Sequence, residues 1–158
     1  MLLRILAFLA VIILTSSLGT AARAEGVILT VTIGGETKTY DRQALESLGL
    51  ETIKTATIWT EGVQEFQGVP LYLLTDAIGT ETGTLLATAI NDYTVEIPLS
   101  DATEGGPILA MRMNGEIMSL RDKGPLWVIY PYDQNAAYRS EVTYSRSIWQ
   151  LDRIEVTQ

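Results

Sequence analysis

Hydrophobic and polar residues alternate along the first part of the chain after residue 26, as they do in β-strands. Residues 27–33 read VILTVTI, a run of alternating apolar and β-branched side chains. Gly34-Gly35 then offers a two-residue turn, and the chain returns through residues 37–40. The pattern predicts an N-terminal β-hairpin.

Two short helices are predicted where apolar residues recur at helical spacing between capping residues. Asp41 is a suitable N-cap for the first, and Pro70 occupies the first turn of the second. Gly49 and Gly79 stand where each helix should end. The second helix carries one apolar stripe, which should lie against a sheet, made of Leu71, Leu74 and Ile78.

The rest of the pattern is mostly β. Strands are predicted at residues 52–59, 85–90, 93–99, 108–113, 116–120 and 153–157. Asn114-Gly115 is a strong hairpin signal. Residues 126–130 (LWVIY) are apolar on both alternations, which predicts a strand at the centre of the sheet. The chain therefore predicts an α+β fold, a single mixed, β-rich domain with short helices.

Residues 131–145 are predicted to form a long polar and aromatic loop. Loops longer than about 12 residues in a compact domain are usually functional or disordered. This segment contains three tyrosines, which argue against disorder.

The first 24 residues have the pattern of a signal peptide. Arg4 gives a positive start, residues 5–14 are an unbroken apolar run, and Ala22-Arg23-Ala24 resembles a cleavage site. The alternative is an uncleaved membrane anchor, but ten apolar residues fall short of the roughly 20 that span a bilayer. We expect residues 1–24 to be removed, residues 25–158 to form the domain, and the protein to be periplasmic.

Composition excludes several kinds of chemistry. The chain has no cysteine and no histidine, so thiolate chemistry, Ser-His-Asp catalysis and histidine-ligated zinc are excluded. Without Arg4 and Arg23, 9 basic and 19 acidic residues remain, a net charge of −10. Such a charge repels phosphates and anionic headgroups. We therefore expect no nucleic acid partner and no direct membrane binding after cleavage.

Five segments, taken in order, resemble the molybdopterin-binding domain of the sulfite oxidase family. They are FQGVPLYLL (66–74), NDYTVEIPLSD (91–101), ILAMRMNGE (108–116), GPLWVIYPYD (124–133) and WQLDRIEV (149–156). The resemblance implies a sulfite oxidase-like fold. In the redox members of that family, a cysteine about ten residues before the aromatic-x-Gly position binds molybdenum. Counting back from Phe66 reaches Ala56, so molybdenum is not expected here.

A small, exported, cysteine-free version of this fold resembles pterin-binding regulatory proteins that report periplasmic pterins to a membrane-bound cyclic-di-GMP enzyme. The resemblance implies a non-catalytic protein with a pterin ligand and no metal. It also implies a partner, the periplasmic domain of a membrane signalling protein. The alternatives are a molybdopterin-dependent oxidoreductase, an inactive subunit of one, and a ligand-free interaction module.

A pterin offers two aromatic faces and an edge of N–H groups that suits a carboxylate, and arginine can bind its oxo group or an acidic substituent. Aromatic and acidic residues lie side by side near strand ends and loops, where sites usually form. The candidate ligand-binding residues are Trp59, Glu61, Asp92, Tyr93, Tyr132, Asp133, Arg139 and Arg146, with Arg112 as a further donor. No catalytic or metal-binding residue is predicted.

Each candidate also has a structural interpretation. Trp59 is equally consistent with a core or rim aromatic, Asp92 with a turn before Tyr93, and Tyr132-Asp133 with a capped turn. Trp127 and Trp149 lie within strand patterns and are predicted to be core residues. The acidic surplus is either a solvated surface or a complement to a basic partner.

Overall fold

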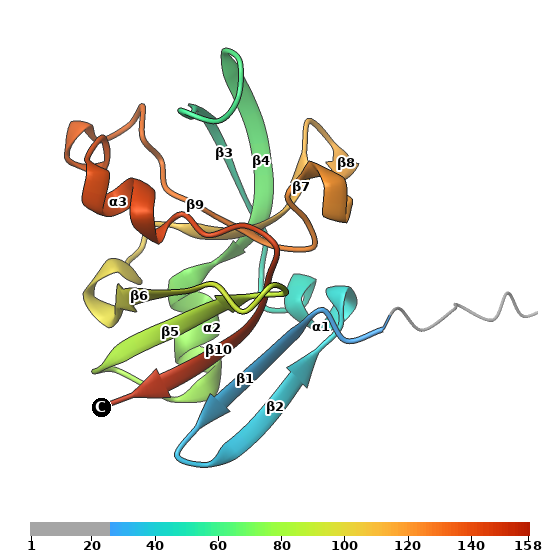
Figure 1. Cartoon of the computed structure of the whole chain (residues 1–158), viewed down its shortest axis with the longest axis vertical. Helices are drawn as coiled ribbons and strands as arrows, with labels where there is room; N and C mark the ends of the chain where they lie inside the picture. Colours follow the sequence, from blue (N-terminus) through green and yellow to red (C-terminus); the bar gives the residue numbers. More distant parts are fainter. Residues whose placement is uncertain (1–25) are drawn as a thin grey trace, which may run out of the picture.

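Residues 26–158 are described by the computed structural model and form two five-stranded sheets with three short α-helices (Figure 1). The predicted signal peptide lies outside the described residues. The first sheet has the order β2-β1-β10-β5-β6. Its strands are β1 (Leu29–Ile33), β2 (Glu36–Tyr40), β5 (Thr84–Ala89), β6 (Thr94–Pro98) and β10 (Leu151–Thr157).

The second sheet has the order β3-β4-β7-β8, and β9 also pairs with β7. Its strands are β3 (Glu51–Ala56), β4 (Val63–Pro70), β7 (Ile108–Met113), β8 (Glu116–Ile117) and β9 (Trp127–Ile129). The helices are α1 (Arg42–Glu46), α2 (Leu71–Ile78) and α3 (Glu141–Arg146). In Figure 1 the first sheet occupies the lower half, with α2 behind it, and α3 lies at the upper left.

The predicted hairpins and the caps at Asp41 and Gly79 are confirmed. Helix α1, however, ends at Glu46, before the predicted Gly49. Pro70 is the N-cap residue of α2 and not part of its first turn. Ile33 pairs with Glu36 across Gly34-Gly35. Both glycines have positive φ, as this tight turn requires. The Asp41 side chain accepts a 2.7 Å hydrogen bond from the Ala44 N–H at the start of α1. The apolar stripe of α2 is buried, and the helix ends at Gly79 in the left-handed conformation.

The strand predicted at 52–59 ends earlier, at Ala56, and a second strand, β4, was not predicted. The Trp59 N–H donates to Thr57 Oγ1, so a local turn replaces the strand ladder. The segment before Pro70 lacks simple alternation because β4 is bulged between Gln67 and Gly68. A Cβ on Gly68 would lie 1.9 Å from the Leu109 carbonyl oxygen, so the β4–β7 pairing requires glycine there.

Three predictions in the C-terminal half are wrong. The strand predicted at 116–120 ends at Ile117, and a 3-10 helix begins at Leu120. Strand β9 is not central, since it pairs with β7 and otherwise makes only an isolated bridge between Trp127 and Trp149. Its side chains are nevertheless buried, and the Trp127 ring packs against Trp59, Phe66 and Trp149. The segment after β9 is not one loop, because it contains α3, whose N-cap Ser140 accepts a hydrogen bond from the Thr143 N–H. The centre of the first sheet is β10, between β1 and β5.

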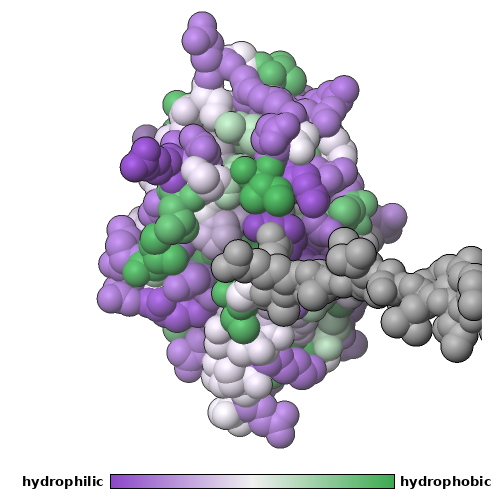
Figure 2. Space-filling model, turned by 90° about the vertical axis from the view of Figure 1, so that its right-hand side faces the viewer, coloured by the Kyte–Doolittle hydropathy of each residue, from purple (hydrophilic) through white to green (hydrophobic). Residues whose placement is uncertain are grey.

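The core contains side chains from both sheets and from α2, and Trp127, Tyr130, Tyr132 and Phe66 are its largest fully buried members. On the visible part of the face in Figure 2, hydrophobic side chains form separate groups among hydrophilic ones. Within residues 26–158, no helix is both long and apolar enough to cross a membrane.

Candidate functional site: an aromatic cleft beside α3

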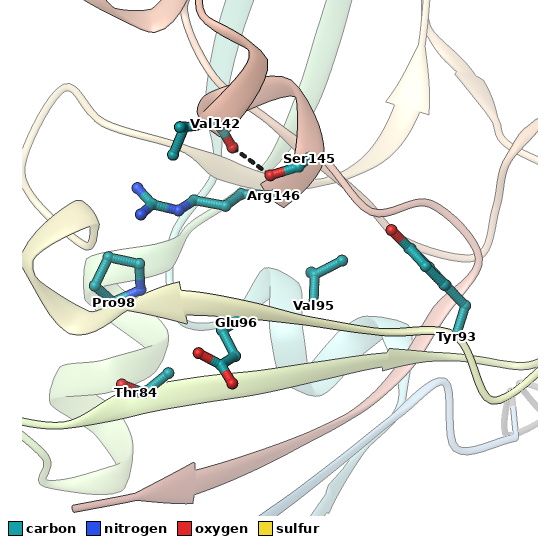
Figure 3. Close-up of a pocket in the computed structure, with 8 residues that line it drawn as sticks. All are labelled: Thr84, Tyr93, Val95, Glu96, Pro98, Val142, Ser145 and Arg146. Atoms are coloured by element: carbon teal, nitrogen blue, oxygen red, sulfur yellow. Dashed lines mark hydrogen bonds between the residues drawn. The ribbon is translucent and has the colours of Figure 1, made fainter.

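Three neighbouring surface pockets lie beside helix α3, and each is lined in part by residues of that helix. The largest is a groove of about 440 Å³ between α3 and strand β6 (Figure 3). It shares Tyr93 and Ser145 with a cleft of about 310 Å³. The cleft shares Tyr144 with a smaller hollow of about 170 Å³ beside Ala56. The three spaces are called here the groove, the cleft and the Ala56 hollow.

Aromatic side chains form much of the cleft wall. Four of them line it: Trp59, Tyr93, Tyr144 and Trp149. The Trp59 ring lies edge-on to Tyr144 at 5.8 Å and to Trp149 at 5.7 Å between ring centroids. Trp59 also meets the buried Trp127 ring at 5.8 Å, so it joins the cleft to the core. Edge-to-face contacts between aromatic rings are favourable, and they fix the orientations of these rings in the cleft wall.

The prediction that Trp149 is a core residue is wrong. Its side chain is 38 % exposed and lies in the wall of the cleft. Trp127, by contrast, is fully buried as predicted. Lys123 explains how an exposed tryptophan is held in place. Its Nζ lies 5.3 Å from the Trp149 ring centroid and 5.5 Å from that of Trp127, which gives two cation–π contacts.

The polar groups of the cleft are all uncharged. They come from Asn91, Ser145, Ser147 and Gln150. Asn91 Oδ1 accepts a hydrogen bond from the Tyr93 N–H, and Gln150 Nε2 donates to the Leu120 carbonyl. These bonds leave the Asn91 amide N–H groups and the Gln150 amide oxygen for a ligand, one donor and one acceptor.

The Ala56 hollow is lined by Ala56, Thr57, Ile58, Tyr132, Asp133, Arg139 and Tyr144. Asp133 Oδ2 accepts a 2.7 Å hydrogen bond from the Ala56 N–H, and the Asp133 N–H donates to Thr55 Oγ1 at 3.1 Å. Arg139 donates to Asp133 Oδ1 at 3.1 Å and to the Tyr132 carbonyl at 2.9 Å. These bonds tie the end of β3 to the segment after β9 and are called here the Asp133 latch.

The upper end of the groove carries a hydrogen-bonded ion pair. Arg146 donates to Asp101 Oδ2 at 2.9 Å, and the Tyr130 hydroxyl donates to the same oxygen at 2.7 Å. The two charged side chains are 26 % and 17 % exposed. In Figure 3 the Arg146 side chain extends from α3 along the upper wall of the groove.

Burial shifts the acidity of two tyrosines below α3. Desolvation raises the pKa of Tyr132 to about 12, although a hydrogen bond with Ser147 partly opposes the shift. Desolvation, followed by the hydrogen bond to Asp101, raises the pKa of Tyr130 well above its usual range. Both hydroxyls are therefore neutral donors at any physiological pH.

The structure distributes the predicted residues over the three hollows. Trp59 and Tyr93 line the cleft, Tyr132, Asp133 and Arg139 line the Ala56 hollow, and Arg146 lines the groove. Glu61 and Asp92 line none of these three spaces. Glu61 is exposed on the β3–β4 turn, and Asp92 forms an ion pair with Arg153. Arg112 lies elsewhere, paired with Glu46 at 2.6 Å.

Sequence reasoning missed eight of the ten residues that line the cleft. They are Ala89, Asn91, Tyr144, Ser145, Ser147, Ile148, Trp149 and Gln150. Trp149 and Gln150 follow α3, and Gln150 has a positive φ of 53°, which the predicted loop and strand did not anticipate. Asn91 lies beside Asp92 and Tyr93 in the quoted NDY segment, so that segment was the available signal.

The donor set of the Ala56 hollow does not fit molybdenum. A soft metal centre needs a thiolate, and the chain has no cysteine. The position that the resemblance assigns to the thiolate is an alanine, and its N–H is bound by a carboxylate. Within residues 26–158, no three histidine, cysteine or acidic side chains are grouped as metal ligands.

Comparison with known proteins identifies the family. The family described as "oxidoreductase molybdopterin binding domain" matches residues 26–156, nearly all of the described chain. The chain therefore belongs to this molybdopterin-binding, sulfite oxidase-like family, and the expected family and fold class are confirmed.

The sulfane dehydrogenase SoxCD from Paracoccus pantotrophus has a similar fold. Its crystal structure matches with a TM-score of 0.61 and 17 % sequence identity, over 81 % of this chain and 37 % of that one. At this identity the likeness concerns the fold alone, and the chain spans little more than a third of the enzyme chain. Comparison with curated protein sequences gives no significant match.

Proposed function

We propose that this protein is a non-catalytic pterin-binding protein of the periplasm. The observation that carries the proposal is the cleft, in which four aromatic side chains surround uncharged donors and acceptors. A pterin is a flat heterocycle with both donor and acceptor groups on its edge. Family membership supports a pterin-type ligand, since the family's domain binds molybdopterin.

The cleft has the size and chemistry that a small ligand needs. Its volume of about 310 Å³ lies at the lower end of the range of small-molecule sites, which starts near 300 Å³. One aromatic stack contributes about 0.5–1.5 kcal/mol and one hydrogen bond about 0.5–1.5 kcal/mol. Micromolar affinity requires about 8 kcal/mol, so enclosure of the heterocycle must supply the remainder.

We propose that the protein is not catalytic because the Ala56 hollow, as lined by the described residues, has no donor that could bind molybdenum. Its alanine and the Asp133 latch replace the soft donor that a molybdenum enzyme of this family presents. The tryptophan on the same turn, Trp59, instead faces the cleft. The turn between β3 and β4 thus contributes an aromatic wall in place of a metal ligand.

We further propose that ligand loading is relayed to the periplasmic domain of a membrane-bound cyclic-di-GMP signalling protein. Exposed apolar side chains lie around the hollows, at Ile58, Tyr93, Val142 and Trp149, each at least 38 % exposed. Patches of this kind are typical of interaction sites. The acidic balance of the chain favours a partner with a basic rim.

The first experiment is to purify the protein from the periplasm of cells that express the full chain. The denatured extract is examined for a fluorescent heterocycle by mass spectrometry, with molybdenum assayed in parallel. A pterin without metal is the expected result. Stoichiometric molybdenum would instead support the oxidoreductase alternative. An empty extract together with failed pterin titrations would leave a ligand-free interaction module.

A further inference from the structure

We propose that the site selects pterins with an uncharged substituent and rejects those with an anionic one, and that Glu96 in the groove is the selecting residue. This inference rests on the proposed pterin function and narrows it to one class of ligand. It concerns the groove because the groove adjoins the cleft and can receive the substituent of a ring held there.

The groove is the larger of the two spaces that adjoin the cleft. Tyr93 and Ser145 line both the groove and the cleft, so the two are continuous at these side chains. The Ala56 hollow is smaller, and the Asp133 latch crosses it. A substituent on a cleft-bound ring therefore has more room beside α3 than beside Ala56.

Two charged side chains line the groove, Glu96 and Arg146. Arg146 is bound to Asp101, which neutralises its charge locally. Glu96 is exposed, and none of the ion pairs among residues 26–158 includes it. Figure 3 shows its carboxylate at the rim of the groove, projecting from β6 on the side away from α3. The uncompensated charge of the groove is therefore negative.

Within the described chain, the outer edge of strand β6 presents unpaired backbone N–H and C=O groups along the groove. The Ala89 N–H donates to the Tyr93 carbonyl, and the Leu99 N–H donates to the Gly83 carbonyl. Because hydrogen-bonded positions alternate along an antiparallel pair, Thr94 and Glu96 turn their backbone groups to the edge that β5 does not occupy. That edge faces α3 (Figure 3). Its N–H and C=O groups suit hydroxyl groups, which both donate and accept.

The remaining surroundings also disfavour an anion. The cleft is lined by no charged residue, and the chain has a net charge of −8. A phosphate or carboxylate in the groove would be repelled by the Glu96 carboxylate, and the residues described at the groove offer it no cation that is not already paired with an acidic residue. A hydroxylated substituent meets no such repulsion.

Two ligands that differ in one group test this. 6-Hydroxymethylpterin and pterin-6-carboxylate are titrated into the full-length protein purified without ligand, near pH 7 and at low salt, by fluorescence or calorimetry. We expect the hydroxymethyl compound to bind about tenfold more tightly, as one repulsion across a partly desolvated groove predicts. The preference should shrink as salt is raised, because the Glu96 charge is exposed and screened.

Glu96→Gln should reduce the preference to about threefold or less by strengthening carboxylate binding, with little effect on the hydroxymethyl compound. Glu36→Gln is the matched control, since Glu36 is an exposed glutamate on β2, at the opposite edge of the same sheet. It makes the same change in net charge and should leave the preference unchanged.

The possible outcomes separate this inference from the proposed function. Equal affinity for the two compounds, or tighter binding of the carboxylate, overturns the inference and leaves pterin binding intact. An unchanged preference in Glu96→Gln, or the same change in Glu36→Gln, also overturns the assignment to Glu96. Failure of both compounds to bind removes the proposed function and the inference with it.

Discussion

The carboxylate of Asp133 accepts a hydrogen bond from the backbone N–H of Ala56, a residue 77 positions earlier in the chain. This bond holds the end of β3 against the segment after β9, and so fixes where the turn with Trp59 begins. Asp133 was predicted as a ligand-binding residue, and its observed contacts give it a structural task beside the cleft.

Asp133→Asn should destabilise the protein by about 1–2 kcal/mol, because the latch loses a charge-assisted bond to a backbone N–H. Urea unfolding measures this. Arg139→Gln is the control, since it removes the exposed ion pair and the bond to the Tyr132 carbonyl but leaves the Ala56 N–H bound, and it should cost less than Asp133→Asn. Equal losses in the two variants would mean that the contacts of Arg139, and not the bond to the Ala56 N–H, stabilise the latch.

Tyr93→Ala should weaken pterin binding about threefold to tenfold, the equivalent of one aromatic stack. Tyr93 is 58 % exposed, so the unfolding midpoint should barely change. Fluorescence titration measures the affinity. Tyr72→Ala, on α2 and outside all three hollows, is the matched control. An affinity equal to that of the unchanged protein would exclude Tyr93 from the site.

Lys123→Met should lower the free energy of unfolding by about 0.5–1 kcal/mol, because it removes the cation from the Trp127 and Trp149 rings while keeping an apolar stem. Pterin affinity should fall as well, since Trp149 lines the cleft. Chemical unfolding and titration test the two effects separately. Lys38→Met, on the exposed strand β2, should change neither quantity.

Stability should decline at alkaline pH through Tyr132. Its pKa in the folded protein, about 12, lies above the unstructured value of 10.0. The protonated tyrosine therefore stabilises the fold fully below pH 10, and this contribution of about 2–3 kcal/mol is lost as the pH rises toward 12. Urea midpoints measured over this range should fall less steeply in Tyr132→Phe. An identical pH profile in the variant would contradict the assignment.

Local signals in the sequence predicted the turns, the N-cap of α1 and the buried stripe of α2, because each depends on a few neighbouring residues. Strand β4 was missed because its bulged pairing with the distant β7 decides it. The early end of β3 was missed because it depends on a side-chain turn at Thr57 and on the distant Asp133. The site was predicted in part. Trp59 and Tyr93 were found from local aromatic patterns, whereas Trp149 joins the cleft through contacts with the distant Trp59, Lys123 and Trp127.

The place of β10 in the first sheet has a consequence for folding. Thr30 pairs with Arg153 in parallel, and Val156 pairs with Leu85 on the other side. The middle of this sheet is therefore supplied by the last strand of the described chain, and β1 has no neighbour on that side until β10 arrives. The first sheet therefore cannot be completed before β10 has been synthesised, whereas the second sheet contains only strands that precede it in the chain.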